Sequence, residues 1–217
     1  MDVQTVCCQI VSLTILVYLT QSTQYVRICR SSLDILSAPG AKIENYNKSH
    51  VRISLQRYNL SSINNEFRVT FDFRTSSPDG ILFYGRAIDS QQYVAISMYR
   101  GDIIYTVRCP SLHADITLAT TNRFDDGNWH QVEYILSYEH DAATGYLAVD
   151  GSRPSRNYTV DCELLRRLYM GGLGPGVVFR FQHGNIQLGH FKGCIRNMFV
   201  PVGQILPPKY YAVSVCD

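Results

Sequence analysis

The chain has 217 residues, of which 46% are hydrophobic and 18% charged, and its formal net charge at pH 7 is only +2. This composition is typical of one globular domain with extensions that buries a substantial core. The net charge is too small to support nucleic acid or an acidic membrane as the partner. The 15 tyrosines and nine phenylalanines favour β-structure, because aromatic side chains pack well on a pleated, half-buried face.

The first 23 residues differ from everything that follows. Residues 6–19 form an uncharged apolar stretch, which small polar residues follow up to Thr23. This order resembles a secretory signal peptide with cleavage near its end, although no Lys or Arg precedes the stretch. A membrane anchor is the alternative, but the stretch is shorter than the ~20 residues that a spanning helix needs.

Residues 24–41 show no convincing period and end in Ala38-Pro39-Gly40. We expect an exposed N-terminal extension here, with a short helical turn at residues 32–36. The folded domain is then expected to cover residues 42–217.

Short strands are expected after residue 41, and residues 67–74 show the pattern most clearly. Their apolar side chains alternate with polar ones, which predicts an inward face made of Phe67, Val69, Phe71 and Phe73. Further strands are expected at residues 51–55, 81–86, 93–99, 102–107, 129–138 and 146–149. Residues 164–192 are rich in glycine, which predicts loops and tight bends. Many short strands with turn signals between them predict a sandwich or a barrel.

The stretch at residues 123–151 predicts a turn, a long strand, a loop at residues 140–145 and a second strand. Asp126-Gly127-Asn128 is a turn signal, and Asp150-Gly151 ends the second strand. Alternation in the first strand places on one face His130, Val132, Tyr134 and Leu136. His130 is expected to be a packed strand residue.

The order of several short motifs is more specific than this alternation. Asp-Gly-Asn-Trp-His at residues 126–130 is followed by Val-Asp-Gly at 149–151, Leu-Tyr-Met-Gly-Gly-Leu at 168–173 and Phe-Lys-Gly-Cys-Ile-Arg-Asn at 191–197. Together with Phe-Asp-Phe-Arg-Thr at 71–75, these motifs resemble the laminin G-like domain of laminins, neurexins and agrin. The resemblance covers residues 42–217.

The resemblance implies an all-β fold, a concanavalin A-like jelly-roll β-sandwich of two antiparallel sheets. It also implies a secreted adhesion or recognition module, located in the extracellular matrix or at the cell surface. Such a module binds a protein or glycan partner through loops at the rim of the sandwich.

No motif predicts catalysis. The six histidines form no His-Glu-x-x-His, and the chain has no G-x-S-x-G elbow and no P-loop. Jelly-roll glycosidases need two carboxylates that face one cleft, whereas the acidic residues here fall mostly at turns and outward positions. We therefore predict neither an enzyme nor a resident cofactor.

Five cysteines remain if the leader is removed. The resemblance implies a disulfide between Cys194 and Cys216, closing a loop that contributes roughly 3 kcal/mol by loop entropy. Cys109 and Cys162 end two similar strings and would pair if their strands are neighbours. Cys29 would then be odd, as a free thiol or as a bridge to another chain.

Family members often bind calcium through an Asp just ahead of the strand at 93–98. Gln92 stands at that position here, and Asp89 lies three residues earlier. A neutral amide is a weaker ligand for a cation that prefers carboxylates, so we expect no site of the usual kind.

Family members also bind heparan sulfate or other acidic glycans through basic patches, and the forked donors of arginine suit sulfate. The candidate residues near the rim are Arg153, Arg156, Arg166, Arg167, Arg180, Lys192 and Arg196. A solvated face of mixed charge is the alternative. N-glycosylation acceptors occur at Asn47, Asn59 and Asn157.

Two other functions remain open. One is a carrier that holds a small apolar, steroid-like ligand between the sheets. The other is a lectin-like or glycoside-cleaving sandwich.

Overall fold

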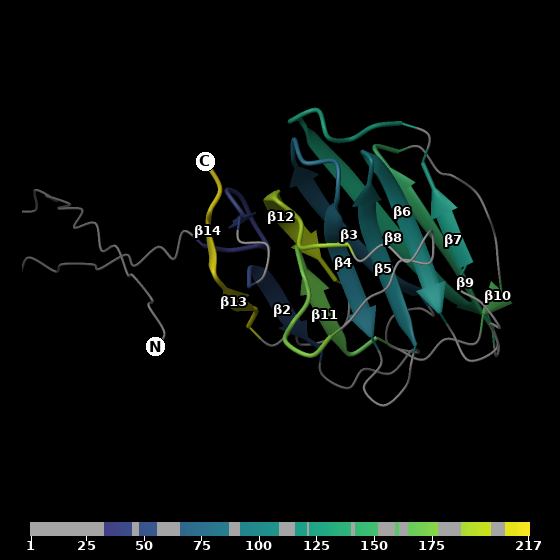
Figure 1. The fold of residues 1–217 in the computed structure, drawn as a ribbon. Helices are drawn as coiled ribbons and strands as arrows, with labels where there is room; N and C mark the ends of the chain where they lie inside the picture. Colours follow the sequence, from purple (N-terminus) through teal and green to yellow (C-terminus); the bar gives the residue numbers. More distant parts are fainter. Residues whose placement is uncertain are drawn as a thin grey trace, which may run out of the picture.

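The computed structural model describes residues 33–44, 48–55, 66–86, 92–108, 116–120, 122–139, 142–151, 159–160, 165–177, 188–200 and 207–217. Within these residues, fourteen strands form two seven-stranded antiparallel sheets that lie face to face (Figure 1). The predicted all-β sandwich is confirmed. In the same described part of the chain, no helix has the length and apolar character needed to cross a membrane.

The first sheet, called sheet I, has the strand order β10-β9-β8-β3-β12-β1-β14. Its strands are β1 (Ala41–Ile43), β3 (Glu66–Arg74), β8 (Trp129–Glu139), β9 (Ala142–Val149), β10 (Thr159–Val160), β12 (Gly193–Phe199) and β14 (Val213–Val215).

The second sheet, called sheet II, has the order β13-β2-β11-β4-β5-β6-β7. Its strands are β2 (His50–Ser54), β4 (Gly80–Arg86), β5 (Tyr93–Tyr99), β6 (Asp102–Arg108), β7 (Ile116–Ala119), β11 (Arg167–Met170) and β13 (Lys209–Tyr211).

The core lies between the sheets and is filled by side chains from both inner faces. Its largest fully buried members include Phe71, Phe73, Phe83, Tyr105 and Tyr134. The rings of Tyr105 and Tyr134 reach across from opposite sheets, with their centroids 5.4 Å apart. Aromatic pairs at this separation stabilise a core beyond the area that they bury.

The alternation predicted for β3 and β8 is confirmed where side chains are described. The buried inward residues are Val69, Phe71, Phe73, Val132 and Tyr134. Ile135 points to the opposite face and is only 1% exposed, so the outer face of sheet I is covered at that point. The side chains of Phe67 and Leu136 lie outside the described part.

The prediction of an exposed extension up to residue 41 is wrong for Ile35, Gly40 and Ala41, which are buried, whereas residues 36–39 are exposed. Ile35 is fully buried in the core; its N–H donates to Tyr210 Oη at 3.1 Å, and its carbonyl accepts from Met198 N–H at 3.0 Å. Strand β1 pairs with both β12 and β14. The sandwich therefore includes residues ahead of the predicted boundary at 42. Residues 1–32, with the predicted signal peptide, lie outside the described residues.

Two predicted loops contain strands. β9 begins at Ala142, directly opposite Glu139, and Gly145 pairs with Leu136 inside the ladder. The glycine-rich region at 164–192 contains β11, which lies between β2 and β4 in sheet II. Backbone pairing holds Ala142, Ala143 and Gly145 in β9 despite their low β-propensity.

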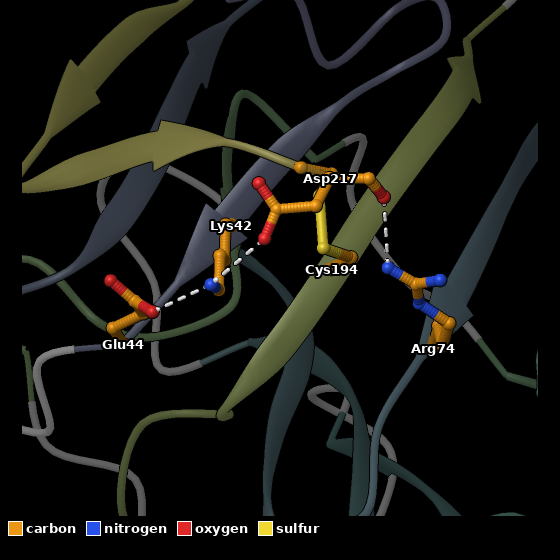
Figure 2. Close-up of a disulfide and its surroundings, with 6 residues drawn as sticks. Lys42, Glu44, Arg74, Cys194 and Asp217 are labelled. Atoms are coloured by element: carbon orange, nitrogen blue, oxygen red, sulfur yellow. Dashed lines mark hydrogen bonds and ion pairs between the residues drawn. A yellow bond between two sulfur atoms is a disulfide. The ribbon is translucent and has the colours of Figure 1, made fainter. Parts of the chain in front are cut away.

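The predicted disulfide between Cys194 and Cys216 is present, with the two Cα atoms 5.9 Å apart (Figure 2). It links β12 to the segment after β14, on either side of β1. Asp217 adds polar contacts on the surface: its carboxylate lies 3.4 Å from Lys42 Nζ, and its carbonyl accepts from Arg74 at 3.1 Å. The end of the described chain is thereby fixed to sheet I.

Candidate functional site

All basic residues in the strands of sheet II point to its outer face. Inward neighbours in the core, such as Val51, Ile53 and Leu168, set this direction because successive strand side chains alternate between faces. The basic residues are Arg52, Arg86, Arg108, Arg167 and Lys209. They come from five of the seven strands.

The strand register brings these cations together near one end of the sheet. Arg167 of β11 lies directly opposite Arg86 of β4, and Lys209 of β13 lies opposite Arg52 of β2. Like charges directly opposite each other on neighbouring strands are destabilising. We call Arg52, Arg86, Arg167 and Lys209 the basic band.

The basic band has no acidic counterpart in its own sheet. Asp102 is the one Asp or Glu in the seven described strands of sheet II, and it lies at the far end of β6, opposite Tyr99. Among the described residues, no ion pair involves a member of the band. The Nε atoms of Arg52 and Arg86 are buried and have no hydrogen-bond partner in that same part of the chain. A buried donor without an acceptor costs stability.

Aromatic rings lie beneath and beside the band. Five rings, which we call the aromatic ladder, follow one another across the sheet: Tyr211, His50, Tyr169, Tyr84 and Tyr93. The centroids of neighbouring rings are 4.4, 6.0, 6.4 and 5.7 Å apart, in that order. Burial raises the pKa of Tyr84 and lowers the pKa of His50. Both shifts favour the uncharged form of these two rings.

One member of the band is oriented by this ladder. The guanidinium carbon of Arg52 lies 5.7 Å from the centroid of the Tyr211 ring. This is the range of a cation–π contact, which positions the cation without neutralising it.

The structure divides the predicted glycan-binding residues between two places. Arg167 belongs to the band, and Arg166 adjoins it through a backbone N–H that donates to the Arg86 carbonyl at 3.1 Å. Lys192 lies at the other end of the sandwich, next to Phe191, whose backbone is beside Gly80 at the start of β4. Arg196 lies on β12 of sheet I, opposite Asp72. Since β4 runs from Gly80 to Arg86, the two groups are separated by about 20 Å. The described candidates therefore do not form one patch, and their part in glycan binding stays a prediction. Arg153, Arg156 and Arg180 lie outside the described residues.

Arg196 is engaged in contacts that hold the fold together. Its guanidinium carbon lies 3.8 Å from the centroid of the Trp129 ring, and its Nε donates to Asp72 Oδ2 at 3.3 Å. Arg74 approaches the same ring at 5.0 Å. These contacts join β3, β8 and β12 on the outer face of sheet I.

His130 connects two turns, one at Asp126 and one at Asp150. Its Nε2 lies 2.9 Å from Asp126 Oδ1 and its Nδ1 lies 2.8 Å from Asp150 Oδ2, while Phe73 and Phe124 pack against the ring. Burial by itself lowers the pKa of His130, but the hydrogen bonds to Asp150 and Asp126 outweigh it and raise the pKa above 6.5. Hydrogen bonds from Asn128 and His130 hold the pKa of Asp126 at about 2. The prediction that His130 is packed in the strand is confirmed, and its bonds to the two turns are an additional finding.

Several other predictions fall on positions that the structure does not describe. They concern Asp89, the pair Cys109 and Cys162, Cys29, and the glycosylation acceptors Asn47, Asn59 and Asn157. Gln92 is described and is only 5% exposed. Within the described residues, no group of three or more His, Cys, Asp or Glu side chains could hold a metal ion. The expectation about calcium remains a prediction.

Sequence reasoning missed Arg52, Arg86 and Lys209. The period of two in residues 51–55 already places Arg52 on the outward face of its strand, whereas residues 81–86 do not alternate and give no such signal for Arg86. The chain order gives no sign that β13, β2, β11 and β4 are neighbours. That adjacency comes from long-range pairing.

Comparisons with known proteins agree with this architecture. The sequence model described as the laminin G domain matches residues 73–201. The laminin subunit alpha of Drosophila melanogaster is 24% identical over 178 residues, which are 75% of this chain and 5% of that protein. The human laminin subunit alpha-1 is 30% identical over 58% of this chain and 4% of its own length. The basement membrane-specific heparan sulfate proteoglycan core protein of Mus musculus is 28% identical over 65% of this chain and 4% of its own.

Solved structures show the same fold. Domains LG4-5 of the mouse laminin alpha1 chain superpose with a TM-score of 0.64 at 21% identity, over 83% of this chain and 47% of that one. A heptameric SAP-like pentraxin from Limulus polyphemus superposes with a TM-score of 0.53 at 13% identity, over 77% of this chain and 76% of that one. This chain spans only about a twentieth of the matched laminin and proteoglycan relatives. With the family model matching more than half of its residues, the chain belongs to the laminin G domain family.

Proposed function

We propose that this chain is an extracellular recognition module that binds an acidic glycan at the basic band of sheet II. It acts by docking, and no bond in the glycan is made or broken. Export through the leader at residues 1–23 and a final place in the matrix or at the cell surface belong to the same proposal. The names of two relatives support that location, since laminins and the basement membrane proteoglycan are matrix proteins.

The observation that carries the proposal is a set of cations without counter-charges. Arg52, Arg86 and Arg167 face the same way, and none forms an ion pair within the described residues. Arginine offers a planar fork of donors that matches the oxygens of sulfate and carboxylate groups. Since these groups occur on acidic glycans, they are the partner that the band suits best.

Calcium is not needed at this site in the proposed mode. The band supplies positive charge directly, whereas calcium-mediated binding requires several oxygen ligands around the ion. Gln92, at the position of the usual aspartate, is buried. Binding is therefore expected to persist in the presence of a chelator.

The apolar-carrier alternative has less support. The space between the sheets holds the packed core, which includes Tyr105 of sheet II and Tyr134 of sheet I. A ligand there would have to displace buried aromatic side chains. This packing favours a surface site over an interior one.

Retention on immobilised heparin tests the proposal. The double variant Arg86→Gln with Arg167→Gln should elute at a clearly lower salt concentration than the unaltered chain. Arg100→Gln with Lys192→Gln removes the same charge at the opposite end and should elute close to the unaltered chain. Equal losses in the two variants would show that net charge alone sets the binding, and would refute the site.

A further inference from the structure

The cations of the basic band are spread across the strands rather than along them. From β13 through β2 and β11 to β4, each member lies on the next strand, in the order Lys209, Arg52, Arg167, Arg86. Neighbouring strands are about 4.8 Å apart, so the three steps from Lys209 to Arg86 cover about 14 Å. Along the strand direction the four positions occupy only two adjacent outward rows, about 7 Å apart.

We propose that the basic band binds a linear polyanion whose chain lies across strands β13, β2, β11 and β4. This inference rests on the proposed function and adds the direction and minimum length of the ligand. The polyanion presents one sulfate or carboxylate to each successive strand. A single small anion meets at most one directly opposite pair, either Arg86 with Arg167 or Arg52 with Lys209.

The pair Arg86 and Arg167 supports this arrangement. The two residues are directly opposite each other, and like charges in this position repel in the ligand-free protein. One negative group between them removes the repulsion and gives both guanidiniums an acceptor. The pair therefore forms a two-cation contact at one end of the band.

Contact with Lys209 makes the affinity depend on the length of the ligand. It lies on the edge strand β13, two strands away from Arg167, and its side chain is exposed. A short ligand centred on Arg86 and Arg167 cannot also reach Lys209, whereas a chain lying across four strands does. Linking several weak contacts in one ligand raises the overall affinity without any new kind of contact.

The absence of acids on the same strands keeps the whole path open to a polyanion. Within the described strands of sheet II, Asp102 is the single acidic residue, and it lies at the other end of β6. A polyanion running parallel to the strands would soon leave the two basic rows. A polyanion across them passes a cation on each of the four strands.

Size-defined heparin oligosaccharides test the direction and length of the ligand. Affinities are measured by titration calorimetry with a chelator present, from the disaccharide to the dodecasaccharide, for the full chain and two variants. For the full chain, the dissociation constant should fall about tenfold or more with length and then level off, as one further charged contact is added. Lys209→Gln should weaken binding of the long oligosaccharides severalfold and leave the disaccharide unchanged.

The result that overturns the inference differs from the one that overturns the proposed function. A disaccharide that binds as tightly as the dodecasaccharide, or a long chain that is insensitive to Lys209→Gln, excludes the orientation across the strands. Loss of affinity at every length in Arg86→Gln with Arg167→Gln would still uphold the site. If that double variant binds all lengths as the full chain does, the basic band itself is excluded.

Discussion

The outer faces of the two sheets differ in whether their charged side chains are paired with opposite charges. On sheet I, Arg68 contacts Glu133 at 2.8 Å and Arg196 contacts Asp72 at 3.3 Å, so cations sit beside carboxylates. On sheet II, Arg86 faces Arg167 and no described carboxylate is near. Paired charges hold strands and turns in place, whereas unpaired ones cost stability and are free to meet a ligand. This difference is the reason why we propose the outer face of sheet II as the surface that binds a partner.

The largest effect is expected from the covalent link on sheet I. Replacing Cys194 and Cys216 together by Ser should lower the free energy of unfolding by roughly 3 kcal/mol, because the closed loop no longer restricts the unfolded chain. Urea unfolding of the oxidised chain and the double variant measures this. A change below about 1 kcal/mol would show that noncovalent pairing of β14 already fixes the segment.

Variants of Arg196 and Arg167 test most directly whether the outer face of sheet I stabilises the fold and the outer face of sheet II binds the ligand. Arg196→Gln should cost about 1–2 kcal/mol of stability, since it removes both the stacking on Trp129 and the ion pair with Asp72. Heparin elution should hardly change in that variant. Arg167→Gln should do the reverse, with a lower elution salt and an unchanged urea midpoint. The same pattern of loss in both variants would contradict the division of roles.

His130 gives sheet I a pH dependence that sheet II lacks. Its pKa is raised in the folded chain by Asp150 and Asp126, so its stabilisation is fully present below the unfolded value of 6.5. That stabilisation is lost as pH rises through the folded pKa. Below pH 6 we expect His130→Gln to cost about 1 kcal/mol, and near pH 9 the two chains should become more alike.

Urea unfolding at several pH values, together with an NMR titration of the His130 ring, checks this expectation. The control is His190→Gln, a half-buried histidine whose Nδ1 lies 2.8 Å from a backbone carbonyl, that of Ser49. A gap between His130→Gln and the unaltered chain that grows with pH would contradict the assigned cause.

The smallest effect concerns the band without its ligand. Arg86→Gln should leave stability unchanged or raise it by about 0.5 kcal/mol, because the repulsion from Arg167 disappears. Addition of heparin should raise the melting temperature of the unaltered chain more than that of the variant. Clear destabilisation of the unliganded variant would show that Arg86 has a structural role.

The sequence predicts the sandwich and most strand positions because alternation is a local signal. Phe71 and Phe73 alternate with polar residues in β3, and their burial follows from that pattern. Ile35 shows the limit of this reasoning: it belongs to no periodic run, and its burial depends on contacts with Tyr210 and Met198 far along the chain.

The basic band shows the same limit at the level of function. Arg167 could be suspected from its charge and Arg52 could be placed on a strand face, but their proximity depends on β11 pairing with β2. Neighbours in the sheet that are over a hundred residues apart in sequence leave no local trace. For the same reason the sequence alone does not separate Lys192 from Arg167, which are 25 residues apart in the chain and lie at opposite ends of the sandwich.

The short tail of the chain connects the two sheets mechanically. β13 forms the edge of sheet II, β14 forms the edge of sheet I, and Ala212 alone stands between them with a φ of 47°. Cys216, four residues beyond this corner, is bonded to Cys194. The disulfide therefore also anchors β13, the strand that carries Lys209. Reduction of this disulfide in sheet I would therefore also loosen the edge strand of sheet II.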